Sequence, residues 1–337
     1  MAASDRHVVV LGGGIQGASS AFHLAKRGAK VTIVEVEAVG SAASGKAGGF
    51  LARDWGSGPT RKLHTESFRM HRELAGELGI ESYRGISTVS VASGRGTAGL
   101  QHSSWLDGGI GMARLMDDDQ STAQVTPLEL TEKLASAAFG MGAELVIGRA
   151  KGIVEGGPGV VEGVRVSVEG EERVLECTDV LVAMGVWSTL TAPWFNLDAD
   201  AWPITGIKST HAIWTDREAI RKEPVALFCG EEPNGTHLEI YPRANGDMYA
   251  CGIGGSDYVD SRARLEEGGD CGTPSSVQAD LTRVKAATAS AAKLTSLVQG
   301  PPERVGACMR PCPPDAMPFM DRVEGWTNAF ISAGHNW

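Results

Sequence analysis

Apolar and polar residues follow two different spacings along this chain of 337 residues. Residues 8–11 and 31–34 form short unbroken apolar runs, and residues 18–27 between them carry apolar positions at helical spacing. Strand, helix and strand in this order predict a βαβ unit with a parallel sheet. A later apolar run, residues 179–185, ends in glycine and is expected to be a further parallel strand.

The alternation of strand and helix patterns continues in some segments and is interrupted in others. Helices are predicted over residues 60–79 and 128–141, whereas the segments 83–117 and 201–304 contain mainly short β runs, with one helix over 277–298. The predicted fold class is therefore α/β, or α+β overall. A Rossmann-like nucleotide-binding domain (residues 1–82, 118–200 and 305–337) carries an inserted, mostly antiparallel β-sheet domain (residues 83–117 and 201–304).

A glycine-rich turn joins the first strand to the first helix: Gly12-Gly13-Gly14-Ile15-Gln16-Gly17. Gly12 permits the tight turn, Gly14 lets the backbone approach a pyrophosphate, and Gly17 lets helix and strand pack closely. The N–H groups and positive dipole end of the helix favour the phosphate charges. Glu35 follows the second strand, where a carboxylate can accept ribose hydroxyls. These features together predict dinucleotide binding.

The segment of residues 40–49, Gly-Ser-Ala-Ala-Ser-Gly-Lys-Ala-Gly-Gly, contains almost no side-chain volume. It cannot fill a core, so it is expected to be a loop that contacts a flat ligand through its backbone.

Composition and charge exclude several function classes. A hydrophobic content of 42% indicates a globular chain, and with a net charge of −10 and no dense Lys/Arg cluster we expect no nucleic-acid partner. No apolar run approaches the roughly 20 residues that span a bilayer, and no leader peptide is evident, so we expect a cytoplasmic protein. The six cysteines form no CxxC pair and no paired spacing with histidine, so no metal site is expected.

Four segments in this order resemble the flavoprotein family of D-amino-acid, glycine and sarcosine oxidases. They are the glycine turn with Glu35, the loop of residues 40–49, the segment of residues 180–188, and Arg310-Pro311-x-x-Pro314-Asp315-x-x-Pro318 followed by Asn328, Gly334 and His335. The resemblance covers nearly the whole chain and implies an FAD-binding domain with an inserted substrate domain.

The resemblance implies that FAD lies extended, with its flavin ring between the two domains. A permanently held FAD needs backbone along its length, which residues 40–49 and 183–185 can supply. Ser41 and Ser44 would donate to phosphate or ribityl oxygens, and Lys46 stands where the family often has arginine. The expected cofactor-binding residues are Gly12, Gly14, Ile15, Gln16, Gly17, Glu35, Ser41, Ser44, Lys46, Gly48, Gly49, Ala183, Gly185, Trp187, Cys308, Gly334 and His335.

The implied reaction is oxidation of a C–N bond of an amino acid or secondary amine, by hydride transfer to flavin with O₂ as the expected acceptor. Arg310 matches the residue that holds the substrate carboxylate, the alternative being an ion pair with Asp315 or Asp321. Tyr241 resembles a residue on the strand facing the flavin, and is either a carboxylate contact or a packing residue. Cys308 aligns with the cysteine that some members bond to the flavin, the alternative being a buried thiol.

The sequence departs from the family at its end. In relatives a long helix follows the Gly334-His335 segment and stabilises the reduced flavin, whereas this sequence ends at Trp337. A fragment, a mispredicted gene product and a natural variant with weakened flavin affinity all remain open. Two rival functions also remain, an NAD(P)-linked dehydrogenase and a catalytically impaired dinucleotide-binding adaptor.

Overall fold

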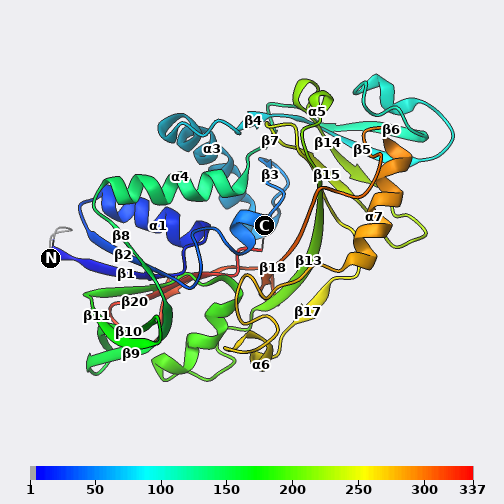
Figure 1. Ribbon diagram of the computed structural model, residues 1–337. Coiled ribbons are helices and arrows are strands. Elements are labelled where there is room, and N and C mark those ends of the chain that lie inside the picture. Colours follow the sequence, from blue (N-terminus) through cyan, green and yellow to red (C-terminus); the bar gives the residue numbers. More distant parts are fainter. Residues whose placement is uncertain (1–4, 337) are drawn as a thin grey trace.

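The computed structural model describes residues 5–336, and two large sheets organise them (Figure 1). The first has six strands in the order β19-β20-β12-β1-β2-β8. All neighbours are parallel except β19, which runs antiparallel to β20. This confirms the predicted Rossmann-like sheet. Its strands are β1 (His7–Leu11), β2 (Lys30–Glu35), β8 (Glu144–Ile147), β12 (Asp179–Val182), β19 (Phe319–Arg322) and β20 (Ala329–Ala333).

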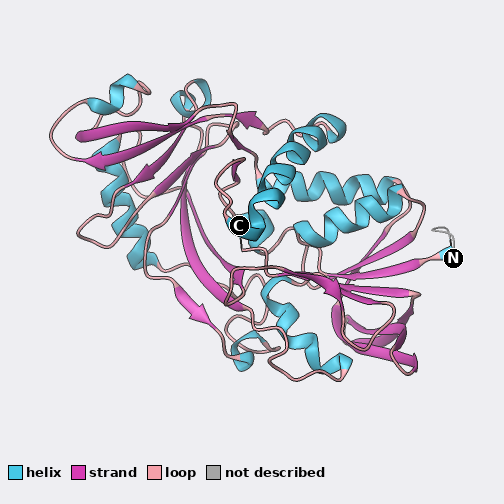
Figure 2. Cartoon of the chain, turned by 180° about the vertical axis from the view of Figure 1, so that it is seen from behind, coloured by secondary structure: helices cyan, strands magenta, loops and turns pink. Residues whose placement is uncertain are grey.

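Both faces of this sheet are buried, which explains the unbroken apolar runs. Val8 and Val10 of β1 pack with helices α1 (Ile15–Lys26), α3 (Arg61–Leu78) and α4 (Pro127–Gly140) on one face. Val9 and Leu11 face the other side, against a three-stranded antiparallel sheet and a 3₁₀ segment. These opposing layers are visible in Figure 1 and from behind in Figure 2. The covering elements are β9 (Arg149–Gly157), β10 (Val160–Val168), β11 (Glu171–Glu176) and the 3₁₀ segment Gly185–Phe195.

The second large sheet has eight strands and is mainly antiparallel. Helix α7 (Leu281–Leu294) covers one face, where Ala287 and Ala291 pack with Leu227 and Ile240. The opposite face bears the site described below. The strands are β5 (Ser87–Ser93), β6 (Ile110–Asp117), β13 (Thr205–Trp214), β14 (Val225–Cys229), β15 (Glu239–Pro242), β16 (Met248–Cys251), β17 (Asp257–Val259) and β18 (Arg304–Cys312).

Smaller elements join the two large sheets. A three-stranded sheet has the order β3-β7-β4, and short helices lie in the connections. They are β3 (Phe50–Ala52), β4 (Arg84–Gly85), β7 (Thr122–Gln124), α2 (Ala43–Lys46), α5 (Glu218–Lys222) and α6 (Arg262–Leu265).

Local signals explain where several helices begin and end. The Asp280 carboxylate accepts hydrogen bonds from the backbone of Thr282 and Arg283, so α7 begins there rather than at residue 277. Helix α3 ends at Gly79, whose φ of +61° is a left-handed conformation that glycine adopts without strain. Pro127 opens α4, where its missing N–H costs nothing.

The structure corrects one detail of the sequence-based picture. The segment of residues 40–49 is not loop throughout, because Ala43–Lys46 forms the helical turn α2. The domain boundaries stay a prediction. Strand β18, which carries Arg310, pairs with β13 in the eight-stranded sheet. Among residues 5–336, no helix combines the length and apolar character needed to cross a bilayer.

Candidate FAD and substrate site

The glycine turn brings β1, α1 and β12 into contact that side chains would prevent. Gly12 has a φ of +104°, and a Cβ there would lie 2.4 Å from the Ala183 carbonyl oxygen. A Cβ on Gly17 would lie 1.9 Å from the Gly12 carbonyl oxygen. Gly14 is the N-cap of α1, in extended conformation. The turn therefore exposes backbone where the helix begins, as the sequence predicts.

Glu35 lies beside this turn at the end of β2. Its Oε2 accepts a hydrogen bond from Gly13 N at 2.8 Å, and its Oε1 accepts one from Glu37 N at 3.1 Å. Burial raises the pKa of Glu35, while these backbone donors counteract the rise. The carboxylate is thus held in place before any ligand arrives.

The small-residue loop lies against the start of α1. Gly40 N donates to the Gly13 carbonyl oxygen at 3.0 Å, and the Ser44 hydroxyl accepts from Ile15 N at 2.8 Å. The Ser41 hydroxyl oxygen is buried and has no hydrogen-bond partner among residues 5–336. A buried hydroxyl without a partner is costly, so this oxygen is a candidate contact for a ligand atom.

The far end of the loop touches the eight-stranded sheet. A Cβ on Gly48 would lie 2.3 Å from the Tyr241 ring, and a Cβ on Gly49, where φ is +82°, would lie 1.8 Å from the Val125 carbonyl oxygen. The Tyr249 hydroxyl donates to the Lys46 carbonyl oxygen at 2.9 Å, and the Arg243 guanidinium donates to that of Ala47 at 3.1 Å. The loop therefore connects the nucleotide turn to the sheet face.

This sheet face combines aromatic rings with buried titratable groups. The Tyr241 hydroxyl donates to Glu239 Oε2 at 2.5 Å, and the Cys251 thiol lies 3.5 Å from the same oxygen. Burial raises the pKa of Tyr241 well above its usual range. His211 stacks on Tyr249 at 5.1 Å, and burial, aided by the positive charge of Arg243, lowers its pKa to about 4. Tyr241, Cys251 and His211 are therefore uncharged at neutral pH.

Strand β18 adds Cys308 and Arg310 to the same face. Cys308 lies opposite Ser209 and Arg310 opposite Ile207 in the β13–β18 ladder. Cys308 is buried, and burial raises the pKa of its thiol to about 11 although Lys46 and Arg310 oppose the rise. The Lys46 ammonium donates to the Pro274 carbonyl oxygen at 2.9 Å.

The remaining predicted residues divide into two groups. Gly185, with a φ of +56°, and Ala183 lie at the end of β12 beside Gly12. His335 is half-buried, its Nδ1 has no partner within the described part of the chain, and burial lowers its pKa to about 4. The side chains of Trp187 and Gln16 instead form hydrogen bonds within the protein. The Trp187 indole donates to the Cys271 carbonyl oxygen at 2.9 Å, and Gln16 Oε1 accepts from Ser332 at 3.3 Å.

Sequence reasoning missed Glu239, Cys251 and His211. A signal was present, because Glu239 stands two residues before Tyr241 and therefore shares its face of a strand. The positions of Cys251 and His211 beside it depend on pairing between strands, which no local pattern reveals.

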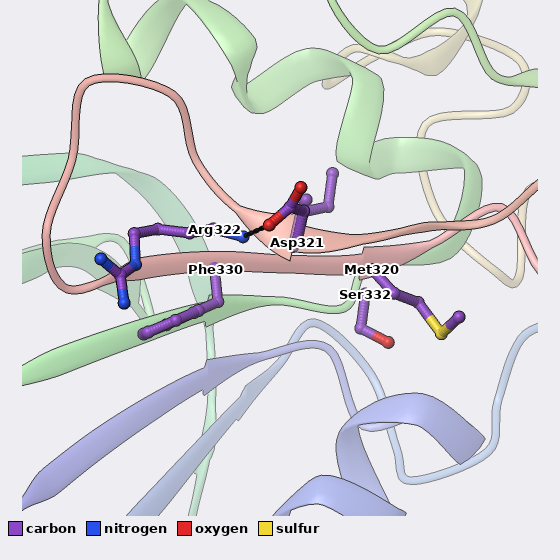
Figure 3. A pocket seen from close by; sticks show the side chains of 6 residues that line it. Met320, Asp321, Arg322, Phe330 and Ser332 are labelled. Carbon is purple, nitrogen blue, oxygen red and sulfur yellow. Dashed lines mark hydrogen bonds between the residues drawn. The ribbon is translucent and has the colours of Figure 1, made fainter.

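Two surface hollows lie elsewhere, over the six-stranded sheet. One, of about 660 Å³, is lined by Met320, Asp321, Arg322, Phe330, Ile331 and Ser332 (Figure 3). The other, of about 710 Å³, shares Phe330 and extends past Leu181 to His23. None of the predicted site residues lines either hollow, so the candidate site is defined by the glycine turn, the loop and the sheet face. Within residues 5–336, no cluster of three His, Cys, Asp or Glu side chains has a metal-binding arrangement.

The residues of this site fit a dinucleotide. The glycine turn forms a cradle that Cβ atoms would fill, Glu35 is fixed next to it, and the partnerless Ser41 oxygen lies in the adjoining loop. The helix end, the acid and the hydroxyl match the phosphate and ribose parts of such a ligand.

Comparisons with known proteins show which family the chain matches. The family model described as FAD dependent oxidoreductase (DAO) matches residues 7–337. Oxidoreductase C1F5.03c of Schizosaccharomyces pombe is 35% identical over 97 residues, a match that spans 26% of this chain and only 25% of that protein. Glycine oxidase of Bacillus licheniformis is 27% identical over 267 residues, 71% of this chain and 67% of that protein.

A solved structure shares the fold over almost the full chain. The crystal structure of glycine oxidase from Bacillus cereus superposes with a TM-score of 0.77 at 22% identity, covering 98% of this chain and 90% of that one. The family match extends from the first strand through the last, and thus includes the glycine turn, the loop, β12 and β18. The chain therefore belongs to the DAO family of FAD dependent oxidoreductases.

Proposed function

We propose that this protein oxidises the C–N bond of a carboxylate-bearing amino acid or secondary amine, with FAD as the hydride acceptor and O₂ as the final electron acceptor. FAD, when bound, supplies the redox chemistry, which no side chain of the protein provides. The residues proposed to hold it are those of the glycine turn, Glu35, the loop with Ser41, and the end of β12.

One observation carries the proposal. The loop that continues the nucleotide turn makes hydrogen bonds with the sheet face, through Tyr249 to Lys46 and through Arg243 to Ala47. The same face bears Arg310 in register with β13. A cofactor extended along the loop would therefore end next to a guanidinium, which is suited to a carboxylate because it stays charged and offers two parallel donors.

The protein's own groups are proposed to bind and orient the substrate. Arg310 pairs with the substrate carboxylate, and the buried rings of Tyr241 and Tyr249 exclude water from the site. The Tyr241 proton is already donated to Glu239, so this hydroxyl is proposed to fix the Glu239 carboxylate instead of the substrate's. Cys308 is proposed as a buried, protonated thiol at the reacting end.

A turnover screen tests this function. Purified protein loaded with FAD is assayed against amino acids and N-methyl amino acids, both by a peroxide-coupled assay and by reduction of an artificial electron acceptor. We expect flavin absorbance in the purified protein and turnover with at least one carboxylate-bearing amine. Turnover with the artificial acceptor alone would support the proposed C–N oxidation and would show that O₂ is not the final electron acceptor.

The two rival functions give different results in the same experiment. A colourless protein that binds NADH would indicate a nicotinamide-linked enzyme. A yellow protein that oxidises no amine with either acceptor would indicate a dinucleotide-binding protein without this activity. Either result would overturn the proposal.

A further inference from the structure

Glu239 is a carboxylate on the site face that the proposed reaction does not yet use. It opens β15, where it lies opposite Phe228 on β14 and opposite Cys251 on β16. Directly opposed residues share a face of a sheet, as do residues two apart along a strand. Glu239, Tyr241, Tyr249 and Cys251 therefore all point toward the glycine-rich loop, on the face opposite α7.

Both side-chain hydrogen bonds of Glu239 go to one carboxylate oxygen, Oε2, which leaves Oε1 available. Tyr241 and Cys251 both donate to Oε2, at 2.5 and 3.5 Å. Residues 5–336 supply neither a donor to Oε1 nor a cation that forms an ion pair with this group. A half-buried carboxylate held only by neutral donors lacks charge compensation, so it attracts a cationic ligand.

Arg310 supplies the opposite charge on the same face. In the ladders around β13, Ile213 pairs with Tyr249, and Ile207 pairs with Arg310. Residues 207 and 213 share a face, so Arg310 is on the face of Tyr249 and hence of Glu239. The Cys251 thiol senses both charges: burial raises its pKa, Glu239 raises it further, and Arg310 lowers it. The charges of Glu239 and Arg310 therefore both lie close enough to the Cys251 thiol to affect it.

Aromatic rings border Glu239 on its other side. Phe228, opposite Glu239, lies 5.3 Å from Phe50 and 5.1 Å from Trp55 between ring centroids. Phe50 also stacks on Tyr241 at 5.4 Å. Trp55 is 39% exposed, so the cluster forms an apolar wall that reaches the surface. Such a wall favours a large apolar side chain, and ring faces also attract ammonium groups.

We propose that Glu239 binds the ammonium group of an amino acid whose carboxylate pairs with Arg310 and whose large apolar side chain lies against Phe228, Phe50 and Trp55. This inference rests on the proposed function and specifies its substrate class. Glu239 is then a substrate-binding residue, and Tyr241 positions it through their hydrogen bond.

Equilibrium binding of two unreactive probes to the FAD-loaded protein tests the inference. α-Methylphenylalanine has no Cα–H to be oxidised, and 2-methyl-3-phenylpropanoate is the same molecule without the ammonium group. In calorimetric titrations we expect the unaltered protein to bind the amino probe at least tenfold more tightly than the other. Glu239→Gln, whose amide oxygen still accepts from Tyr241, is expected to reduce that ratio to less than twofold.

Two further variants keep the result interpretable. Glu239→Asp retains the charge at shorter reach and is expected to give an intermediate ratio. Glu218→Gln alters an exposed carboxylate that pairs with Lys222 within α5, and is expected to leave the ratio unchanged. Replacing the amino probe by 2-aminoisobutyrate, which lacks the ring, is expected to weaken binding about tenfold through loss of contact with the apolar wall.

The outcomes separate this inference from the proposed function. If Glu239→Gln weakens both probes equally, or changes neither, Glu239 does not bind the ammonium group, and only this inference is overturned. If the unaltered protein takes up FAD but binds neither probe, a substrate with a large apolar side chain is ruled out, and again only this inference is overturned. If it takes up no FAD, the proposed function itself is contradicted.

Discussion

The Gly12 carbonyl oxygen lies 1.9 Å from the point where a Cβ on Gly17 would stand. The contact joins the turn after β1 to the first turn of α1, so it fixes how closely the helix approaches the sheet. No rotamer change can relieve a clash between a Cβ and a backbone carbonyl, because neither atom moves without the backbone.

Gly17→Ala is therefore expected to destabilise the protein by about 2 kcal/mol and to weaken FAD binding, because the helix start must move away from the strand. Chemical denaturation and flavin fluorescence titration measure the two effects. Gly76→Ala is the matched control: Gly76 is in the last turn of α3, with no atom within 4 Å of an added Cβ. Alanine there is expected to stabilise by about 0.5–1 kcal/mol. Equal changes in the free energy of unfolding for the two variants would contradict the close contact between Gly17 and the Gly12 carbonyl oxygen.

Ser41→Ala is expected to change apoprotein stability and cofactor affinity in opposite directions. Its hydroxyl oxygen has no partner within the described residues, so its removal relieves a buried polar group and stabilises the apoprotein by about 1 kcal/mol. FAD affinity is expected to fall about tenfold, or about 1.4 kcal/mol. Ser44→Ala removes the acceptor of Ile15 N and is expected to destabilise the apoprotein instead, by about 1 kcal/mol. Unchanged FAD affinity in the Ser41 variant would show that this hydroxyl does not contact the cofactor.

His211 is expected to make the fold acid-sensitive. Its pKa is about 4 in the folded protein, below the ordinary value of 6.5, because of burial and the nearby charges of Arg243, Lys46 and Arg304. Below pH 6.5 the His211 imidazole is protonated in the unfolded chain, whereas in the folded protein it stays neutral down to about pH 4. The free energy of unfolding therefore falls as the pH falls through this window. Across the whole window, the free energy of unfolding lost through His211 is about 3 kcal/mol.

His211→Phe keeps a ring against Tyr249 and is expected to remove this share of the pH dependence. Denaturation midpoints at pH 7 and pH 4.5 provide the measurement. His335 contributes in the same direction and remains in the variant. If the variant loses as much stability on acidification as the unaltered protein, the imidazole of residue 211 is not the acid-sensitive group.

FAD is expected to be released from the protein by acid precipitation. Attachment at Cys308 needs a thiolate, and with a pKa of about 11 only about one molecule in ten thousand carries one at pH 7. The pellet is therefore expected to be colourless and the supernatant yellow, as for Cys308→Ser. A yellow pellet that becomes colourless in the Cys308→Ser variant would establish the covalent bond.

Arg310→Lys keeps the positive charge but loses the paired donors. If Arg310 binds the substrate carboxylate, kcat/KM is expected to fall about 100-fold, or about 2.7 kcal/mol of transition-state stabilisation, and further in Arg310→Met. Arg322→Lys serves as the control, because Arg322 is an exposed residue of β19 whose guanidinium lies over the Phe330 ring of β20, away from the site. A loss of less than threefold in Arg310→Met would assign the carboxylate to another residue.

Sequence alone determined the part of the site that depends on short-range pattern. The glycine turn, the acid that ends β2 and the small-residue loop are each contiguous, and their predicted roles follow from backbone geometry within a few residues. Apolar periodicity located β1, α1, β2 and β12, although it missed the helical turn within residues 40–49, since small residues give no periodic signal.

Only the tertiary structure decided which residues lie together on the eight-stranded sheet. Glu239, Cys251, His211 and Arg310 come from four strands, and a strand's alternating pattern shows which residues share a face but not which strand is its neighbour. The donation of the Tyr241 proton to Glu239 likewise became visible only in three dimensions. Pairing between distant strands is set by global packing, so the charges and rings that meet there could not be read from any local stretch of the chain.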